Sequence, residues 1–180
     1  KDAGTAITTG DYNTAFGSGA LITCATGSAN TAVGWKALEM CESGGEYNTC
    51  VGMAAGEGLT TGDNNVAIGA SALDAAVTGG GNVAVGASSL STNTSGANNV
   101  AVGYQCLQLS TTASNNVGVG YGALYANTEG HSNVAVGHGA LIANTEADFN
   151  VAIGRDAMGA TANTGAGYNI AIGGSALDGA

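Results

Sequence analysis

A line of aromatic and polar side chains is the feature of this sequence best suited to binding a ligand. Its members recur at multiples of about 17 residues and are Trp35, Tyr104, Tyr121, His138 and Arg155. Aromatic rings that carry polar tips suit the face of a sugar. We therefore predict that these residues form a receptor-binding ridge. The alternative is that the rings only stack on one another and cover edges of the fold.

Two of the four cysteines are spaced for a disulfide bond. Cys24 and Cys41 are 17 residues apart, so they would lie on adjacent coils about 4.8 Å apart, which is within the range that a disulfide spans. The bridge requires an oxidising compartment. The alternative is that the two side chains point in unsuitable directions and are simply small buried residues. Cys50 and Cys106 stand where other copies of the pattern have alanine, and we predict that they are buried free thiols.

The sequence contains no arrangement of residues that would support catalysis or hold a metal ion. His131 and His138 are the only histidines, and neither recurs with a cysteine or a carboxylate at ligand spacing. The glycine-rich segments lack the lysine and the helix of a phosphate-binding loop. Asp11 and Asp63 are too isolated for a calcium-binding β-roll. We expect no enzymatic activity, no metal and no cofactor.

Three acidic residues share another column, namely Glu39, Glu57 and Asp74. On successive coils their charges would lie roughly 5 Å apart. We expect this column to be a solvated edge of the fold, with a weak cation site as the alternative.

These residues are positioned by a repeat that fills the chain. Residues 65–73, NVAIGASAL, are its clearest copy. The first position is Asn, the third is small, the fourth is large and apolar, the fifth is Gly and the ninth is usually Leu or Met. Copies begin at Asn13, Asn30, Asn48, Asn65, Asn82, Asn99, Asn116, Asn133, Asn150 and Asn169. A fixed period of this kind is typical of a solenoid, and the ridge occupies the sixth position.

The alternation of side chains within each copy predicts a short β-strand, and the internal glycines would penalise a helix. We predict an all-β fold, a parallel β-roll or β-solenoid of about ten coils, in a single repeat domain at 1–180. Residues 3–13 resemble residues 55–65, so we expect residues 1–12 to be the end of a preceding coil. The chain is then expected to be a fragment of a longer fibre.

The third position of the repeat predicts a surface at which copies of the chain meet. We expect the large residues of each copy, such as Val83, Val85 and Leu90, to face the core, with the small third residue on the opposite face. Three large side chains per coil are few to offset the entropy of ordering 17 residues, so a second buried surface is needed. The predicted oligomer interface comprises Ala15, Ala32, Ala67, Ala84, Ala101, Ala135, Ala152 and Ala171. The alternative is that these alanines face water or fill the interior of the roll.

The segments NVAIGASAL (65–73), NVAVGASSL (82–90) and NIAIGGSAL (169–177) resemble the repeat of YadA-like heads in trimeric autotransporter adhesins. The resemblance extends over essentially the whole chain. It implies a left-handed parallel β-roll in which three identical chains wind side by side. The period of 17 residues is longer than is usual in adhesin heads and is similar to repeats in phage tail fibres and in surface fibre proteins of aquatic bacteria.

The composition limits the partners. The net charge is −10, and Lys1, Lys36 and Arg155 are the only lysines and arginines. Nucleic acids and anionic membranes attract clustered cations, and no apolar run is long enough to span a membrane. We expect no nucleic-acid partner and no membrane insertion of this segment. The scarcity of lysine and arginine also predicts resistance to trypsin.

The expected function is that of a structural fibre, a shaft or head of an extracellular or virion appendage of the phage tail-fibre type. It would act as a rigid spacer and attachment surface, with itself as partner in a homotrimer and a cell-surface glycan or protein as receptor. The alternative is a bacterial trimeric adhesin or surface filament that binds host or matrix. A third hypothesis is an ice-binding β-solenoid, but the threonine ladder that begins at Thr14, Thr31 and Thr49 gives way to Val66.

Overall fold

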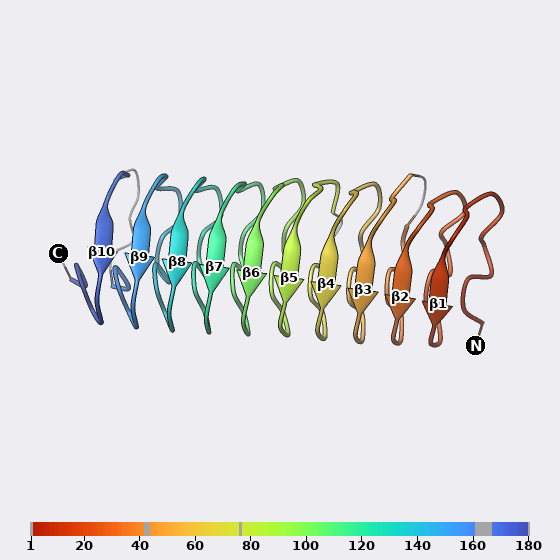
Figure 1. Ribbon diagram of the computed structural model, residues 1–180, viewed down its shortest axis with the longest axis horizontal. Coiled ribbons are helices and arrows are strands. Elements are labelled where there is room, and N and C mark those ends of the chain that lie inside the picture. The colour runs from red at the N-terminus through yellow and green to blue at the C-terminus, as the bar shows by residue number, and fades with distance from the viewer. Residues whose placement is uncertain (1, 42–43, 76, 161–166, 180) are drawn as a thin grey trace.

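The computed structural model describes residues 2–41, 44–75, 77–160 and 167–179. Each copy of the repeat contributes one strand of three residues. The strands are β1 (Thr14–Phe16), β2 (Thr31–Val33), β3 (Thr49–Val51), β4 (Val66–Ile68), β5 (Val83–Val85), β6 (Val100–Val102), β7 (Val117–Val119), β8 (Val134–Val136), β9 (Val151–Ile153) and β10 (Ile170–Ile172). All ten lie in chain order in one sheet (Figure 1). The described part of the chain contains no helix, and the prediction of an all-β parallel solenoid is confirmed.

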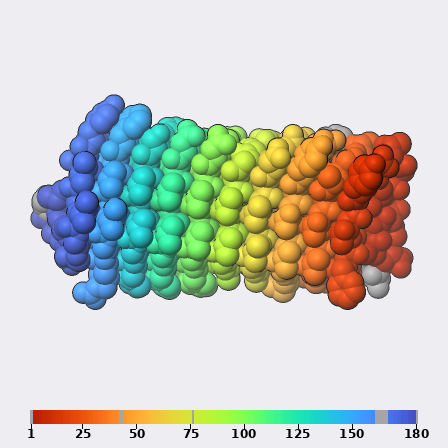
Figure 2. Space-filling view, in the orientation of Figure 1, coloured from red at the N-terminus to blue at the C-terminus, as the bar shows by residue number. Residues whose placement is uncertain are grey.

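The coils stack into an elongated body whose N-terminal and C-terminal ends lie at opposite tips (Figure 1). In the space-filling view, successive coils form bands across the long axis (Figure 2). The strands pair in register, so that Ala67 is opposite Ala84, and Ala84 is opposite Ala101. Any one position of the repeat therefore forms a column that runs along the body.

Alanine, and not valine, fills the interior of each coil. Ala67, Ala84 and Ala101 are fully buried, whereas Val83 and Val85 are only partly buried. The prediction that the third-position alanines form the oligomer interface is therefore wrong, because the chain buries this column within itself. The residues wrongly assigned to the interface all lie in the core or pack against it; they are Ala15, Ala32, Ala67, Ala84, Ala101, Ala135, Ala152 and Ala171. Of the alternatives, the structure supports the alanines as filler of the interior.

The reason for the small side chain is the leucine at the ninth position of the preceding coil. A Cβ on Gly118, which stands in the alanine column, would lie 3.4 Å from Leu107 Cδ1. Ordinary van der Waals contact is therefore reached at the first side-chain carbon. Valine would overfill the site, and the large strand residues point outward instead. The first and third residues of β1 to β10 form the surface that we call the outer face.

The fifth-position glycine allows adjacent coils to approach each other closely. Gly103 has a φ of 139°, in the region that L side chains rarely adopt. A Cβ at this residue would also overlap the carbonyl oxygen of Gly120 in the next coil. Both the backbone conformation and the close approach therefore require glycine at this position.

Four departures from the repeat form two compensating pairs. Cys106 and Cys50 are buried free thiols, as predicted, and burial raises the pKa of each to about 12. A Cβ on Gly118 would lie 2.6 Å from Cys106 Sγ, and a Cβ on Gly56 would lie 2.5 Å from Cys50 Sγ. Glycine replaces the usual alanine or leucine at these two positions because the neighbouring sulfur occupies the space.

A double-mutant cycle tests this compensation. Cys106→Ala should destabilise the fold by about 1 kcal/mol through the cavity that it leaves, and Gly118→Ala by about 1–3 kcal/mol through overpacking. The double variant restores the alanines found at both positions in other coils and should approach wild-type stability. Denaturant unfolding followed by circular dichroism measures the coupling. Additive losses would show that the sulfur does not occupy the glycine's space.

Candidate functional site

Ten asparagines form a hydrogen-bonded column through the solenoid, and all but Asn13 and Asn169 at its ends are fully buried. Asn82 Oδ1 accepts a hydrogen bond from the backbone N–H of Asn99 at 3.0 Å. Asn99 Nδ2 in turn donates to the carbonyl oxygen of Ala113 at 2.8 Å. From Asn13 to Asn133, each amide thus joins its own coil to the next and ties the strand to the returning loop. Sequence reasoning missed this role, although asparagine at the first position of every copy was a signal for it.

Changing one amide of this column to a carboxylate should be strongly destabilising. In Asn99→Asp an acceptor replaces the Nδ2 donor and faces the carbonyl oxygen of Ala113, and a charge is buried without a partner. We expect a loss of about 3 kcal/mol in unfolding free energy at neutral pH. Asn98→Asp is the matched control, since Asn98 is exposed and its change should cost under about 0.5 kcal/mol.

Urea unfolding of both variants provides the comparison. Equal stability of the two variants would mean that the asparagine column does not hold the coils together.

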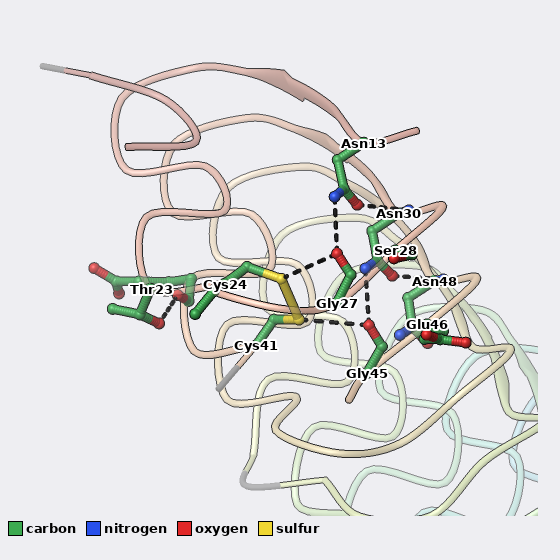
Figure 3. The surroundings of a disulfide bond; sticks show 12 residues. Asn13, Thr23, Cys24, Gly27, Ser28, Asn30, Cys41, Gly45, Glu46 and Asn48 are labelled. Carbon is green, nitrogen blue, oxygen red and sulfur yellow. Dashed lines mark hydrogen bonds between the residues drawn. A yellow bond between two sulfur atoms is a disulfide. The ribbon is translucent and has the colours of Figure 1, made fainter. Parts of the chain in front are cut away.

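The structure joins Cys24 and Cys41 by a disulfide bond, with their Cα atoms 4.5 Å apart. The pair lies on adjacent coils beside the carbonyl groups that the asparagine column uses (Figure 3). Asn13 Nδ2 donates to the carbonyl oxygen of Gly27 at 2.8 Å, and a Cβ on Gly27 would lie 2.8 Å from Cys24 Sγ. The bridge therefore reinforces the same contact between coils that the asparagines make.

Three residues of the predicted ridge form one continuous stack. The ring centroids of Tyr104 and Tyr121 are 5.6 Å apart, and those of Tyr121 and His138 are 4.9 Å apart. The two tyrosines are about half exposed. Arg155, which is also exposed, follows on the next coil. The structure thus brings these four predicted residues into one row.

Trp35 lies in the same column but does not join this row. Met53, Ala70 and Ala87 occupy the intervening coils. The Trp35 ring instead contacts its neighbour Lys36, whose Nζ lies 5.2 Å from the ring centroid. The predicted five-residue ridge is therefore divided into a row of four residues and a separate tryptophan.

Asp156 is a member of the row that sequence reasoning missed. Its Oδ1 lies 3.5 Å from His138 Nδ1, and its Oδ2 lies 3.7 Å from Arg155 Nε. Asp156 directly follows Arg155 in the chain and lies 17 residues after Gly139, the residue that follows His138. This spacing was the sequence signal that could have placed it beside the row. One carboxylate thus faces both His138 and Arg155.

A second aromatic pair lies near the C-terminal end. Phe149 and Tyr168 precede the first-position asparagines of adjacent coils, and their ring centroids are 4.9 Å apart. They border a hollow of about 160 Å³ that Glu146 and Asp148 also line. The rings stack on one another here as they do in the row of Tyr104, Tyr121 and His138, and stacking in both places agrees with the alternative interpretation of the aromatic residues.

The acidic column is neutralised in part by one lysine. Lys36 Nζ lies 2.8 Å from Glu39 Oε2 and 2.9 Å from Glu57 Oε1. The hydrogen bond from Lys36 lowers the pKa of Glu39, whereas burial raises the pKa of Asp74. No group of three side chains suited to a metal ion occurs among the residues that the structure describes. The column thus combines an ion pair network, in which Lys36 bridges Glu39 and Glu57, with the carboxyl group of Asp74, whose charged form is disfavoured by burial.

These opposite shifts predict opposite effects of pH. A raised folded-state pKa means that Asp74 weakens the fold once the pH rises above the usual pKa of about 3.9. Asp74→Asn should therefore stabilise the protein at neutral pH by under about 1 kcal/mol and lose this advantage in acid. Glu39 contributes stability above its usual pKa, and this contribution is lost as the pH falls through the lowered value.

Glu39→Gln should accordingly destabilise the protein at neutral pH and have no effect in acid. Thermal unfolding of both variants and the wild type across pH 3 to 7 gives the comparison. Parallel curves for the two variants would contradict the assigned directions.

Ser114, His131 and Asp148 occupy one column and have the residue types of a hydrolase triad, but their hydrogen bonds do not form a relay. His131 Nδ1 accepts from the backbone N–H of Ser114 at 3.0 Å, and Asp148 Oδ1 accepts from the backbone N–H of His131 at 2.6 Å. A triad requires the imidazole to bond the serine hydroxyl and the carboxylate directly. The column therefore joins coils through their backbones.

No family model matches the chain, and neither a curated protein nor a solved structure matches it. Among the described residues there is no helix long and apolar enough to cross a membrane.

Proposed function

We propose that this chain is a segment of the shaft or head of an extracellular or virion fibre, in which three copies wind side by side as left-handed rolls. In this role it acts as a rigid spacer and an attachment surface. The observation that carries the proposal is the outer face of the sheet.

The outer face carries no charged residue and is mostly apolar. Threonine occupies the first residue of β1, β2 and β3, and every other residue of this face is Val, Ile or Phe. Ile68, Val119 and Ile153 remain 37–40% exposed. Scattered apolar residues are normal on a protein surface, but an uncharged stripe that runs over ten coils indicates an interaction site.

Other copies of this chain are the partners that fit the stripe best. Its side chains repeat at the spacing of parallel strands, about 4.8 Å, over roughly 43 Å. A second roll has the same spacing by construction, so its side chains can interdigitate along the whole length. The resemblance to trimeric adhesin heads and phage tail fibres supports three copies. The interface is thus assigned to the outer face rather than to the alanine column.

The disulfide supports an extracellular location, because disulfides persist in oxidising compartments. The scarcity of lysine and arginine supports it too, because it predicts resistance to trypsin. The phage tail-fibre type is proposed on the length of the repeat. The alternative, a bacterial trimeric adhesin or surface filament, uses the same geometry and differs in its anchor. The ice-binding hypothesis is weaker, because Val66 and its successors interrupt the hydroxyl ladder of the outer face.

Sedimentation velocity of matched lysine variants tests the assembly. Val119 lies on the outer face and Leu109 lies on a loop, and both are 37% exposed. The wild type should sediment as a trimer at micromolar concentration. Val119→Lys buries an unpaired charge at the interface, which costs several kcal/mol, and should dissociate it. Leu109→Lys should leave the trimer intact.

A milder variant distinguishes loss of association from loss of folding. Val117→Thr introduces the residue that β1 to β3 already carry at this position, and it should weaken association while each coil stays folded. A wild type that is folded and monomeric at these concentrations would overturn the proposal. An assembly that Val119→Lys leaves unchanged would do the same.

A further inference from the structure

The stacked rings present their edges to solvent and cover one another's faces. The ring planes of Tyr121 and His138 are inclined by 8°, and those of Tyr104 and Tyr121 by 26°. Within such a stack the inner ring faces are not open to a ligand. The accessible parts are the ring edges with their polar tips, and both tyrosines of the stack are about half exposed. The row therefore offers hydrogen-bonding groups, one for each coil.

The backbone fixes the spacing of these tips. Gly122 N–H donates to the Tyr104 carbonyl oxygen at 3.0 Å, and Gly139 N–H donates to that of Tyr121 at 2.9 Å. Asp156 N–H donates to the carbonyl oxygen of His138 at 2.8 Å. Each residue of the row is thus held by the next coil, and the row is as regular as the sheet. A ligand that bonds all its tips must repeat at the coil spacing, near 5 Å.

The charge of the row excludes an anionic polymer. His138 and Arg155 both face the Asp156 carboxylate, and the chain as a whole carries a net charge of −10. Nucleic acids and sulfated glycans bind through unneutralised cations. An extended peptide is also a poor match, because its side chains on one face recur at about 6.6–6.8 Å. The chemistry that remains is an uncharged polymer with hydroxyl groups at intervals of about one coil.

We propose that Tyr104, Tyr121, His138 and Arg155 bind an uncharged linear polysaccharide that lies along the rod with one sugar for each coil. An extended chain of pyranose rings advances by a length close to one coil step for each sugar. Successive sugars of such a chain are turned over relative to each other, but each has hydroxyl groups on both edges of its ring, so every sugar can offer a hydroxyl group to one tip. This inference rests on the proposed role as an attachment surface and names the ligand class of that surface.

Calorimetric titration of the assembled protein with cello- and chito-oligosaccharides of graded length tests the match. Affinity should rise from the disaccharide to the tetrasaccharide, because each added sugar reaches another member of the row. It should not rise further for the hexasaccharide, because the row has four members. Equal affinity at all lengths, no binding at any length, or preference for an anionic polysaccharide would overturn the proposal.

Two tyrosine variants separate the row from other exposed rings. Tyr121→Ala removes a central tip and should weaken tetrasaccharide binding at least about fivefold. It should fold normally, because Ala70 and Ala87 already occupy this column. Tyr168→Ala, in the separate pair with Phe149, should leave binding unchanged. Equal losses in both variants would count against the row.

Sedimentation of the same samples keeps the two proposals distinct. A trimer that binds no oligosaccharide overturns only the ligand assignment. A monomeric wild type overturns the proposed assembly whether or not it binds sugar.

Discussion

The buried asparagine amide is the interaction on which the rest of this structure depends. A solenoid of three-residue strands has little apolar core in each coil, and the connections between strands are backbone that must find hydrogen-bond partners. The Asn99 side chain provides them in both directions, since its Oδ1 accepts from the N–H of Asn116 and its Nδ2 donates to Ala113. Because the same contact recurs at each coil, it fixes the register along the whole rod.

The period and the strand direction could be predicted from the sequence, but the inside of the coil could not. Alternation states which residues share a face and is symmetric with respect to which face is buried. Which face is buried depends on the space that Leu107 leaves beside the third position of the next coil. There, a side chain reaches van der Waals contact at its first carbon. Leu90 also has a φ of 50°, a conformation that is costly for L residues and that sequence patterns do not indicate.

In the candidate site, too, residue spacing predicted some features and not others. Equal spacing placed Tyr104, Tyr121 and His138 in one column, and the parallel register makes such columns real. The separation of Trp35 from the row could also have been predicted from the sequence, since Ala70 and Ala87 interrupt the column. Spacing alone could not indicate that the rings would lie nearly parallel, which changes a ridge of open faces into a row of edges. The position of Asp156 between His138 and Arg155 depends on side-chain geometry, which the repeat pattern does not indicate.

The division between a constant interior and a variable surface explains how such a rod can gain binding chemistry at little cost in stability. Asparagine, alanine, glycine and leucine hold the coil, and substitutions among them require a compensating change, as at Cys106 and Gly118. The sixth position varies from Gly174 to Trp35. Surface chemistry can therefore change from coil to coil while the backbone keeps the interval constant. Under the proposed role as an attachment surface, the rod selects ligands by their repeat length as well as by their functional groups.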